Sequence, residues 1–269
     1  MQPQTTQKSA FPWWLVVAIA IALAVAVFIA TNDLYSQVFA TVAAGIGITI
    51  FVTVAGFSLA SLLGLGIALM ALSGSRWANE IARFYVEIIR GVPILVLLFW
   101  IAFVGAPAFV SGWNFITAPL RELGLLDALA IRDVSLLWRA IIALTIGYSA
   151  FIAEVFRAGI QSVETGQIEA AKALGLSRWQ RFRLIVFPQA IRTILPPLGN
   201  DFVAMVKDSS LVSVLGVADI TQMGKVYAAG SFRFFETYSI VAYIYLILTV
   251  GLSLALRALE RRMRRAQRA

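Results

Sequence analysis

Long apolar stretches separated by short polar segments restrict the fold of this chain more than any other feature. Crossing about 30 Å of hydrocarbon takes about 20 mostly apolar residues in a helix. Of the 269 residues, 60% are hydrophobic and only 13% are charged, so the apolar surface exceeds what one soluble core of this size can bury. The predicted spans are 13–30, 41–72, 84–104, 136–157, 194–215 and 238–256. We therefore predict an all-α membrane protein with about six transmembrane helices.

The first apolar run, residues 13–30, is open to two interpretations. It follows a polar leader with a single cation, Lys8, as the apolar region of a secretory signal peptide does. The run is long enough to span a bilayer and no soluble domain follows it, which favours a first transmembrane helix. We therefore divide the chain into residues 1–40, a cytoplasmic leader with an extra first helix, and residues 41–269, the transmembrane domain proper.

The second predicted span is long and rich in glycine. Small residues let transmembrane helices approach one another closely, and a long span accommodates the bilayer by tilting. The glycines are Gly45, Gly47, Gly56, Gly64 and Gly66. This helix is therefore expected either to pack closely against its neighbours or to tilt strongly.

Positive charge is divided unevenly between the two sets of loops. Sixteen of the 22 Lys and Arg residues fall in the leader, near the loops that follow the second and fourth predicted spans, and in the C-terminal tail. Five fall on the opposite side. Because loops that stay in the cytoplasm carry the excess, both termini are predicted to be cytoplasmic. The basic tail is expected to anchor a helix end to anionic headgroups. The longest external connection, 105–135, is expected to rest on the outer face with an amphipathic stretch near 120–130.

Several classes of function lack the residues that they need. The chain has no Cys and no His, which removes disulfides, thiol nucleophiles, imidazole bases and the usual zinc ligands. The net charge of +8 comes from basic residues beside apolar runs, a pattern typical of membrane topology and not of nucleic-acid binding. No Gly-x-x-x-x-Gly-Lys-Ser/Thr sequence occurs, so no ATP hydrolysis is expected from this chain. We predict neither catalytic nor metal-binding residues.

The most informative loop lies between the fourth and fifth predicted spans, at about 158–190. Residues 169–174 are good helix formers, Gly175 can end that helix in the left-handed conformation, and Ser177 is a suitable N-cap for a second helix. Pro188 is expected to stop the second helix. Plain connectors between helices take about 2 to 8 residues, so this longer elbow is predicted to be a docking surface. The alternative is an interfacial hairpin with Trp179 and Phe182 inserted in lipid.

The same loop carries a motif of fixed spacing: Glu-Ala-Ala, three residues, Gly, nine residues, Ile, one residue and Leu-Pro. The matching positions are Glu169, Ala170, Ala171, Gly175, Ile185 and Pro188, with Phe in place of the Leu at 187. In this respect the chain resembles the permease subunits of bacterial ATP-binding-cassette (ABC) importers. The resemblance implies a type I ABC importer permease fold whose elbow is the coupling helix that seats in a cleft of the ATPase subunit. It implies that Glu169 caps or pairs with a cation there.

Three further segments resemble a narrower group, the polar amino-acid permeases of the histidine and glutamine type. They are residues 90–99, 149–160 and 207–211. The chain departs from that group where Val92 and Ser209 replace threonines and where Leu97 stands in place of a polar Gln. The resemblance implies import of polar or charged L-amino acids across the bacterial cytoplasmic (inner) membrane.

The resemblance also implies partners. An importer of this family contains two permease subunits, which here are two copies of this chain or this chain and a paralogue, and an ABC ATPase subunit dimer. ATP and Mg are bound by the ATPase subunits, so no cofactor is expected in this chain. A periplasmic or extracellular amino-acid-binding protein delivers the substrate, and membrane lipid surrounds the spans. No nucleic acid is expected as a partner.

Ionisable residues inside predicted spans are candidates for the substrate path. A charge there costs at least ~2.5 kcal/mol, so it needs a partner or a water-filled cavity. Glu154 either pairs with Arg157 at i+3 or faces a substrate ammonium. Glu87 and Arg90 are placed at a cytoplasmic helix end, where snorkelling accounts for them.

The fifth predicted span contains the other candidates. Lys207 and Asp208 either line an aqueous path, where they bind the two ends of a zwitterion, or form a buried ion pair with Glu154 or Arg90 that fixes helix packing. Asn200 and Asp201 are assigned to the same polar surface. The tentative substrate pathway is therefore Glu154, Lys207, Asp208 and Asn200.

Two other classes of function compete with the importer. An ion-coupled secondary amino-acid transporter places carboxylates at the midplane and often shows a repeated half. Glu154 and Asp208 keep this alternative open, although we find no internal repeat and it leaves the elbow unexplained. A membrane scaffold that docks a cytoplasmic partner without transport is the second alternative.

Overall fold

The computed structural model describes residues 13–265, and within them the chain is helical without any strand. The leader residue Lys8 and the tail residue Arg268 lie outside this described part. The α-helices are α1 Trp13–Thr31, α2 Asp33–Ala43, α3 Ile46–Ala71, α4 Arg76–Gly91, α5 Ile94–Trp100, α6 Ala106–Ile116, α7 Ala118–Glu122, α8 Leu136–Gln161, α9 Thr165–Ala173, α10 Arg178–Arg181, α11 Phe187–Asp208, α12 Ile220–Ser231 and α13 Phe234–Arg265. Two π-helical turns, Ile101–Gly105 and Phe182–Val186, and two 3₁₀ segments, Ile131–Asp133 and Ser209–Leu215, connect them.

Five helical segments in the described residues are long and apolar enough to cross a membrane. They are Trp13–Thr31, Asp33–Ala71, Ile94–Ile116, Leu136–Gln161 and Phe234–Arg261. The first, fourth and last contain the predicted spans 13–30, 136–157 and 238–256, and the second contains nearly all of 41–72. The prediction of a multi-spanning helical membrane protein is therefore confirmed.

The bounds of the third predicted span, 84–104, are wrong. Helix α4 ends at Gly91, because Val92 is extended, with φ −101° and ψ 128°, as residues before proline usually are. A new helix begins after Pro93 and continues through the first π-helical turn to residue 116. The predicted external connection 105–135 therefore starts as helix. Its expected amphipathic stretch is only the short α7, followed by irregular residues.

The fifth predicted span, 194–215, also differs from the structure. Helix α11 begins at Phe187, contains Pro196 and Pro197 in its interior, and gives way at Ser209 to the 3₁₀ segment. It is not among the five apolar segments. Its charged and polar side chains lower its hydropathy. Two of them, Asp201 and Asp208, line a cavity that is described below.

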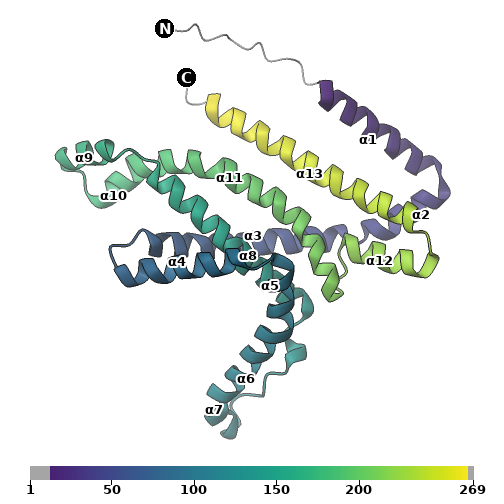
Figure 1. The fold of residues 1–269 in the computed structure, drawn as a ribbon, viewed down its shortest axis with the longest axis horizontal. Coiled ribbons are helices and arrows are strands. Elements are labelled where there is room, and N and C mark those ends of the chain that lie inside the picture. The colour runs from purple at the N-terminus through teal and green to yellow at the C-terminus, as the bar shows by residue number, and fades with distance from the viewer. Residues whose placement is uncertain (1–12, 266–269) are drawn as a thin grey trace.

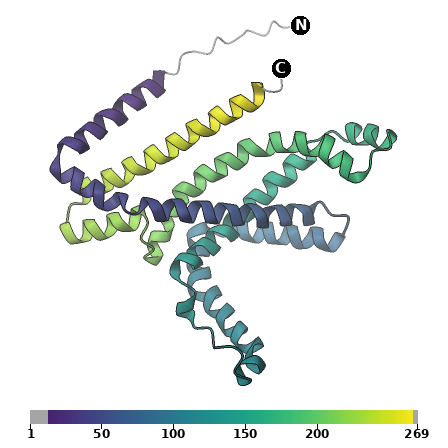
Figure 2. The same ribbon diagram turned by 180° about the vertical axis from the view of Figure 1, so that it is seen from behind.

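Helices α3, α4, α5 and α11 pack around α8, while α1, α2, α12 and α13 pack against one another around a second core (Figures 1 and 2). Helix α3 lies along α8, and α11 packs against another part of it. Their buried side chains form the main hydrophobic core, which includes Val52, Ala60, Ile141, Leu144 and Met205. The elbow formed by α9 and α10 lies toward the same end of the long axis as the α3–α4 loop, and α12 lies toward the opposite end. Helices α5 to α7 form an arm that extends away from this bundle.

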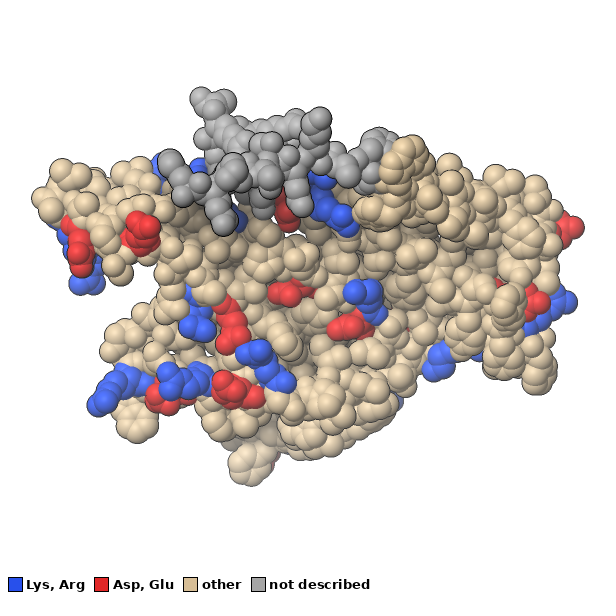
Figure 3. Space-filling model, turned by 45° about the horizontal axis from the view of Figure 1, so that its top comes forward, with Lys and Arg blue, Asp and Glu red and all other residues tan. Residues whose placement is uncertain are grey.

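Most of the exterior is apolar. In the view of Figure 3 the charged side chains lie in small groups on a largely uncharged surface. Large side chains such as Leu23 and Leu62 are 62% and 70% exposed. Soluble monomers rarely expose apolar surface on this scale, so lipid or a second subunit is expected to cover it.

The buried Arg139 connects the arm to the bundle. Its Nε donates to the carbonyl of Val134 at 2.8 Å, and its two terminal nitrogens donate to the carbonyls of Ala102 and Ile131. We expect Arg139→Ala to lower the free energy of unfolding by about 3 kcal/mol, because these carbonyls lose charged donors. Thermal unfolding in detergent measures this, with the exposed Arg132→Ala as the matched control. Equal midpoints for the two variants would contradict the assignment.

Candidate docking elbow and polar cavity

The elbow between α8 and α11 is built by local sequence signals. Helix α9 ends at Ala173, and Gly175 has the left-handed φ of +76° that such an ending requires. Helix α10 begins after Ser177, whose Oγ accepts from the backbone N–H of Gln180 at 3.3 Å, while the Gln180 Oε1 accepts from the N–H of Ser177 at 2.9 Å. This reciprocal capping box confirms the predicted helix, turn and second helix.

The prediction that Pro188 stops the second helix is wrong. After α10 the chain stays helical through the π-helical turn Phe182–Val186 and enters α11, with Pro188 in the first turn of that helix. The N–H of Phe187, directly before the proline, bonds to the carbonyl of Phe182 five residues earlier, so the wider π-helical turn carries the helix into Pro188. The elbow is therefore continuous with α11.

The elbow is fastened to the bundle at its base. A Cβ on Gly159 would lie 2.2 Å from Cγ1 of Ile194, so α8 and α11 approach each other there as closely as glycine permits. The Gln189 side chain of α11 donates to Oε1 of Gln167 in α9 at 2.6 Å. These contacts join α9 to α11 and α11 to α8, so a displacement of the elbow is expected to move both long helices.

The motif residues divide between the inside and the outside of the elbow. Ala171 is 2% exposed, whereas Glu169, Ala170 and Gly175 face outward. The remaining positions, Ile185 and Pro188, are half-buried. An exposed carboxylate beside small residues is suited to the close approach of another protein.

Apolar side chains extend the outer face of the elbow. Leu174 is 80% exposed, and Trp179, which is 66% exposed, stacks on Phe182 with ring centroids 5.8 Å apart. This surface fits either a partner protein or lipid.

A cavity of about 480 Å³ with a mostly apolar wall and three charged side chains lies where α4 ends and α5 begins, beside α8 and α11. Its charged lining consists of Arg90, Asp201 and Asp208. The Tyr148 hydroxyl donates to Oδ2 of Asp208 at 2.7 Å, and the Arg90 guanidinium lies over the Phe151 ring at 5.5 Å from its centroid. The cavity can hold a small polar molecule.

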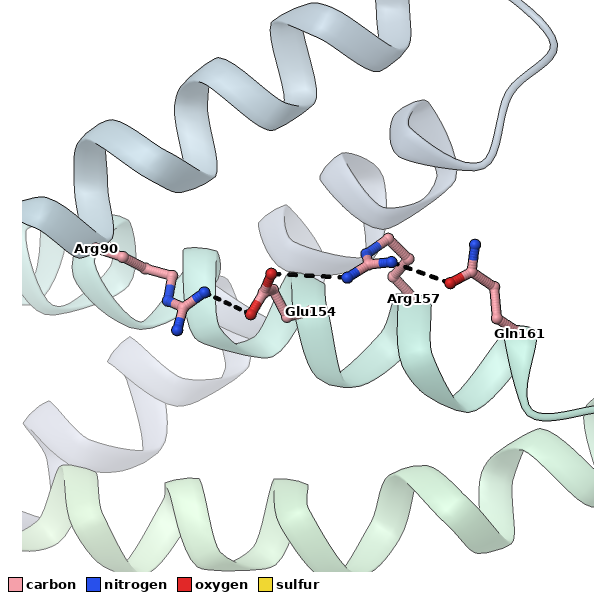
Figure 4. Close-up of polar contacts among 4 residues, drawn as sticks. All are labelled: Arg90, Glu154, Arg157 and Gln161. Atoms are coloured by element: carbon pink, nitrogen blue, oxygen red, sulfur yellow. Dashed lines mark hydrogen bonds and ion pairs between the residues drawn. The ribbon is translucent and has the colours of Figure 1, made fainter.

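A chain of charged contacts runs from this cavity along α8 (Figure 4). Nη1 of Arg90 donates to Oε2 of Glu154 at 2.6 Å, and the other oxygen of Glu154 lies 3.7 Å from Nη2 of Arg157. Arg157 in turn donates to Gln161 at 3.0 Å. Glu154, Arg157 and Gln161 also line a second cavity, of about 270 Å³, between α3, α4 and α8. The Arg90–Glu154 pair therefore joins the linings of the two cavities.

The structure does not bring all the sequence-predicted residues together. Glu154 has the expected i+3 contact with Arg157, but its shorter contact is with Arg90, which was attributed to snorkelling. Asp208 lines the larger cavity and makes no ion pair within the described residues, nor does Lys207. Lys207 and Asn200 are exposed and do not line either cavity.

Asp201, which was assigned to the polar surface of the fifth span, does line the larger cavity, whereas three other lining residues were missed: Arg90, Tyr148 and Phe151. One signal could have found the first of them. The sequence Arg-Gly-Val-Pro ends α4 directly after Arg90 and so places its guanidinium at a helix break. The other two, both on α8, face the cavity only because α8 packs beside α5 and α11.

Comparison with known proteins gives consistent results. The sequence model of the family described as "Binding-protein-dependent transport system inner membrane component" matches residues 60–265. The glutamine transport system permease protein GlnP of Escherichia coli (strain K12) is 37% identical over 220 residues, which cover 82% of this chain and 91% of that protein. The probable amino-acid permease protein YxeN of Bacillus subtilis (strain 168) is 35% identical over 230 residues, covering 86% and 94%.

Solved structures agree with these sequence matches. The crystal structure of an amino acid ABC transporter with histidines has a chain that is 36% identical, with a TM-score of 0.70, over 86% of this chain and 99% of that one. An inward-facing structure of the MetNI methionine ABC transporter aligns with a TM-score of 0.62 at 19% identity, over 87% and 99%, and supports the fold alone.

Proposed function

Because the chain belongs to the family of binding-protein-dependent transport system inner membrane components, and is therefore an ABC importer permease subunit of type I fold, we propose that it carries polar or charged L-amino acids. One observation carries this proposal: the exposed motif-bearing elbow is fastened to α8 and α11, two helices that also line the larger cavity with its charged side chains. The relatives' substrates support amino acids as the cargo.

The elbow is the part proposed to receive the energy of ATP hydrolysis. In this proposal Glu169, Ala170, Ala171 and Gly175 contact an ABC ATPase subunit, and Ile185 and Pro188 support them from the base of α11. ATP and Mg belong to that subunit, which acts as a dimer. A second permease subunit, identical or paralogous, and an external amino-acid-binding protein complete the transporter.

In the proposed mechanism this chain opens and closes the transport path and catalyses no reaction itself. When the ATPase subunits close, they draw the two elbows together, and each elbow tilts α8 and α11 through the contacts at its base. The tilt changes which side of the membrane the cavity faces. The Arg90–Glu154 contact joins α4 to α8, so it is expected to rearrange when these helices move.

The elbow also fixes the proposed orientation in the bacterial cytoplasmic membrane. If the elbow meets a cytoplasmic ATPase, the end of the molecule that carries it is cytoplasmic, and both termini lie on that side. The excess of Lys and Arg in the same set of loops supports this assignment.

Replacing Glu169 by lysine tests the proposed function. We expect Glu169→Lys to reduce both pull-down of a co-expressed ABC ATPase subunit and ATP-dependent amino-acid uptake by at least tenfold, because the exposed carboxylate is replaced by the opposite charge. Glu122→Lys, at an exposed site on α7, is the matched control and is expected to keep both. Uptake that needs no ATPase and stops when the proton or sodium gradient is collapsed would instead establish an ion-coupled transporter.

A further inference from the structure

The charges around the larger cavity do not balance. On the basis of the function proposed above, we propose that this cavity binds L-amino acids with a cationic side chain in preference to neutral ones. The proposal rests on three features of the cavity: the sign of its uncompensated charge, the spacing of its carboxylates and the apolar character of the rest of its wall.

The net charge of the cavity and its attached ion pairs is negative. The carboxylates are Asp201, Asp208 and Glu154, and the guanidiniums are Arg90 and Arg157. Three negative groups against two positive ones leave one negative charge without a partner. In an apolar surrounding an uncompensated charge is costly, so a ligand with a net charge of +1 stabilises the site more than a neutral zwitterion does.

Each of the two cavity carboxylates has one oxygen without a hydrogen-bond donor from the described residues. Oδ2 of Asp201 is buried without a hydrogen-bond partner, and Asp208 accepts from Tyr148 at only one of its oxygens. A buried polar atom without a partner is rare in folded proteins and calls for an explanation. In this proposal the Asp201 side chain, which lines the cavity, turns its covered oxygen toward the cation of the ligand, and that cation supplies the missing donor.

The spacing of these carboxylates fits a ligand with two cationic groups. Asp201 and Asp208 are seven residues apart on α11, which places them on one face with a rise of about 10 Å between them. One carboxylate can therefore receive the α-ammonium while the other receives a side-chain ammonium or guanidinium. A neutral amino acid leaves one of the two unpaired.

Arg90 completes the set of contacts for an amino acid. A guanidinium has five N–H donors, and the side chain of Arg90 has one hydrogen-bond partner within the described residues, Glu154. The other donors can bind the ligand's α-carboxylate, and the cation–π contact with the Phe151 ring helps to hold the guanidinium in place. Between these charged groups the wall is apolar, with Ile94, Leu97 and Ala204. It suits the aliphatic stem of a lysine or arginine side chain.

The test is direct binding to the full chain in lipid nanodiscs, with L-arginine, L-lysine, L-glutamine and L-glutamate as probes. We expect L-arginine and L-lysine to bind at least tenfold more tightly than L-glutamine, and L-glutamate to bind least. Asp201→Asn and Asp208→Asn keep the side-chain shape, and each is expected to reduce the arginine-to-glutamine affinity ratio. Asp127→Asn, an exposed carboxylate outside both cavities, is expected to leave it unchanged.

The outcomes separate this inference from the proposed function. If L-glutamine binds as tightly as L-arginine, or if neither aspartate substitution alters the ratio, the cationic preference is overturned, while amino-acid import stands. If none of the four amino acids binds, the proposed substrate class falls together with the inference. Thermal unfolding of each variant checks that its fold is intact. The Glu169→Lys experiment probes the elbow separately and does not depend on which amino acid is carried.

Discussion

Gly175→Val is expected to reduce ATP-driven uptake at least tenfold while the chain still inserts in the membrane. Gly175 has a φ of +76°, a conformation that costs an ordinary L-residue roughly 1–2 kcal/mol and a β-branched residue more. The turn also aligns the backbone bonds that end α9, from Gly175 to Lys172 at 3.0 Å and from Leu176 to Ala171 at 3.1 Å. Each 1.4 kcal/mol of strain lowers the equilibrium ratio of native to distorted elbow about tenfold.

The controls for this prediction separate backbone strain from lack of space. A Cβ on Gly175 would have no atom within 4 Å, so crowding cannot account for a loss of function. Asparagine tolerates the left-handed conformation, and Gly175→Asn is therefore expected to retain most of the uptake. Gly166→Val changes an exposed glycine of the same loop, which has equal space and a helical conformation. Equal losses in all three variants would mean that the turn is not the cause.

The elbow could be predicted from sequence because its signals act over a few residues. A glycine that needs a left-handed conformation and a serine that caps the following helix determine their local structure almost regardless of what surrounds them. Pro188 was misjudged for a related reason. Its effect depends on its position within a helix, and the π-helical turn before it could not be seen in the sequence.

The span boundaries illustrate the limit of apolar patterns. Residues 84–104 are an apolar run with few charges, but the steric effect of Pro93 on Val92 divides that run between α4 and α5. In α11 the polar residues that interrupt the apolar pattern are the informative ones. They mark a helix that lines a cavity, which the apolar residues of this helix do not show.

The cavity could not be predicted because its contacts join distant parts of the chain. Arg90 and Glu154 are 64 positions apart, and Tyr148 and Asp208 are 60 apart. Such pairs depend on how α4, α8 and α11 pack against one another. The sequence identified Glu154 and Asp208 as charges that need partners, but it did not identify those partners.

Gly64→Leu is expected to destabilise the folded chain by about 1–3 kcal/mol or more, whereas Gly66→Leu is expected to be tolerated. A Cβ on Gly64 would lie 2.9 Å from the carbonyl oxygen of Ser149 and 3.1 Å from the backbone nitrogen of Ala153, so α3 would have to move away from α8. A Cβ on Gly66 would have no atom within 4 Å.

The pair tests which of the glycines in this long helix the fold requires. Both substitutions add the same side chain to α3 two positions apart, so differences in helix propensity cancel and only the contact with α8 differs. Thermal unfolding of the purified chain in detergent measures the effect, and a lower midpoint for Gly64→Leu alone is the expected result. Because α8 carries Glu154 and leads into the elbow, a shifted α3–α8 contact is also expected to disturb the cavity. If Gly66→Leu is the more destabilised variant, its open face is covered in the assembled transporter, and a second permease subunit is the first partner to test there.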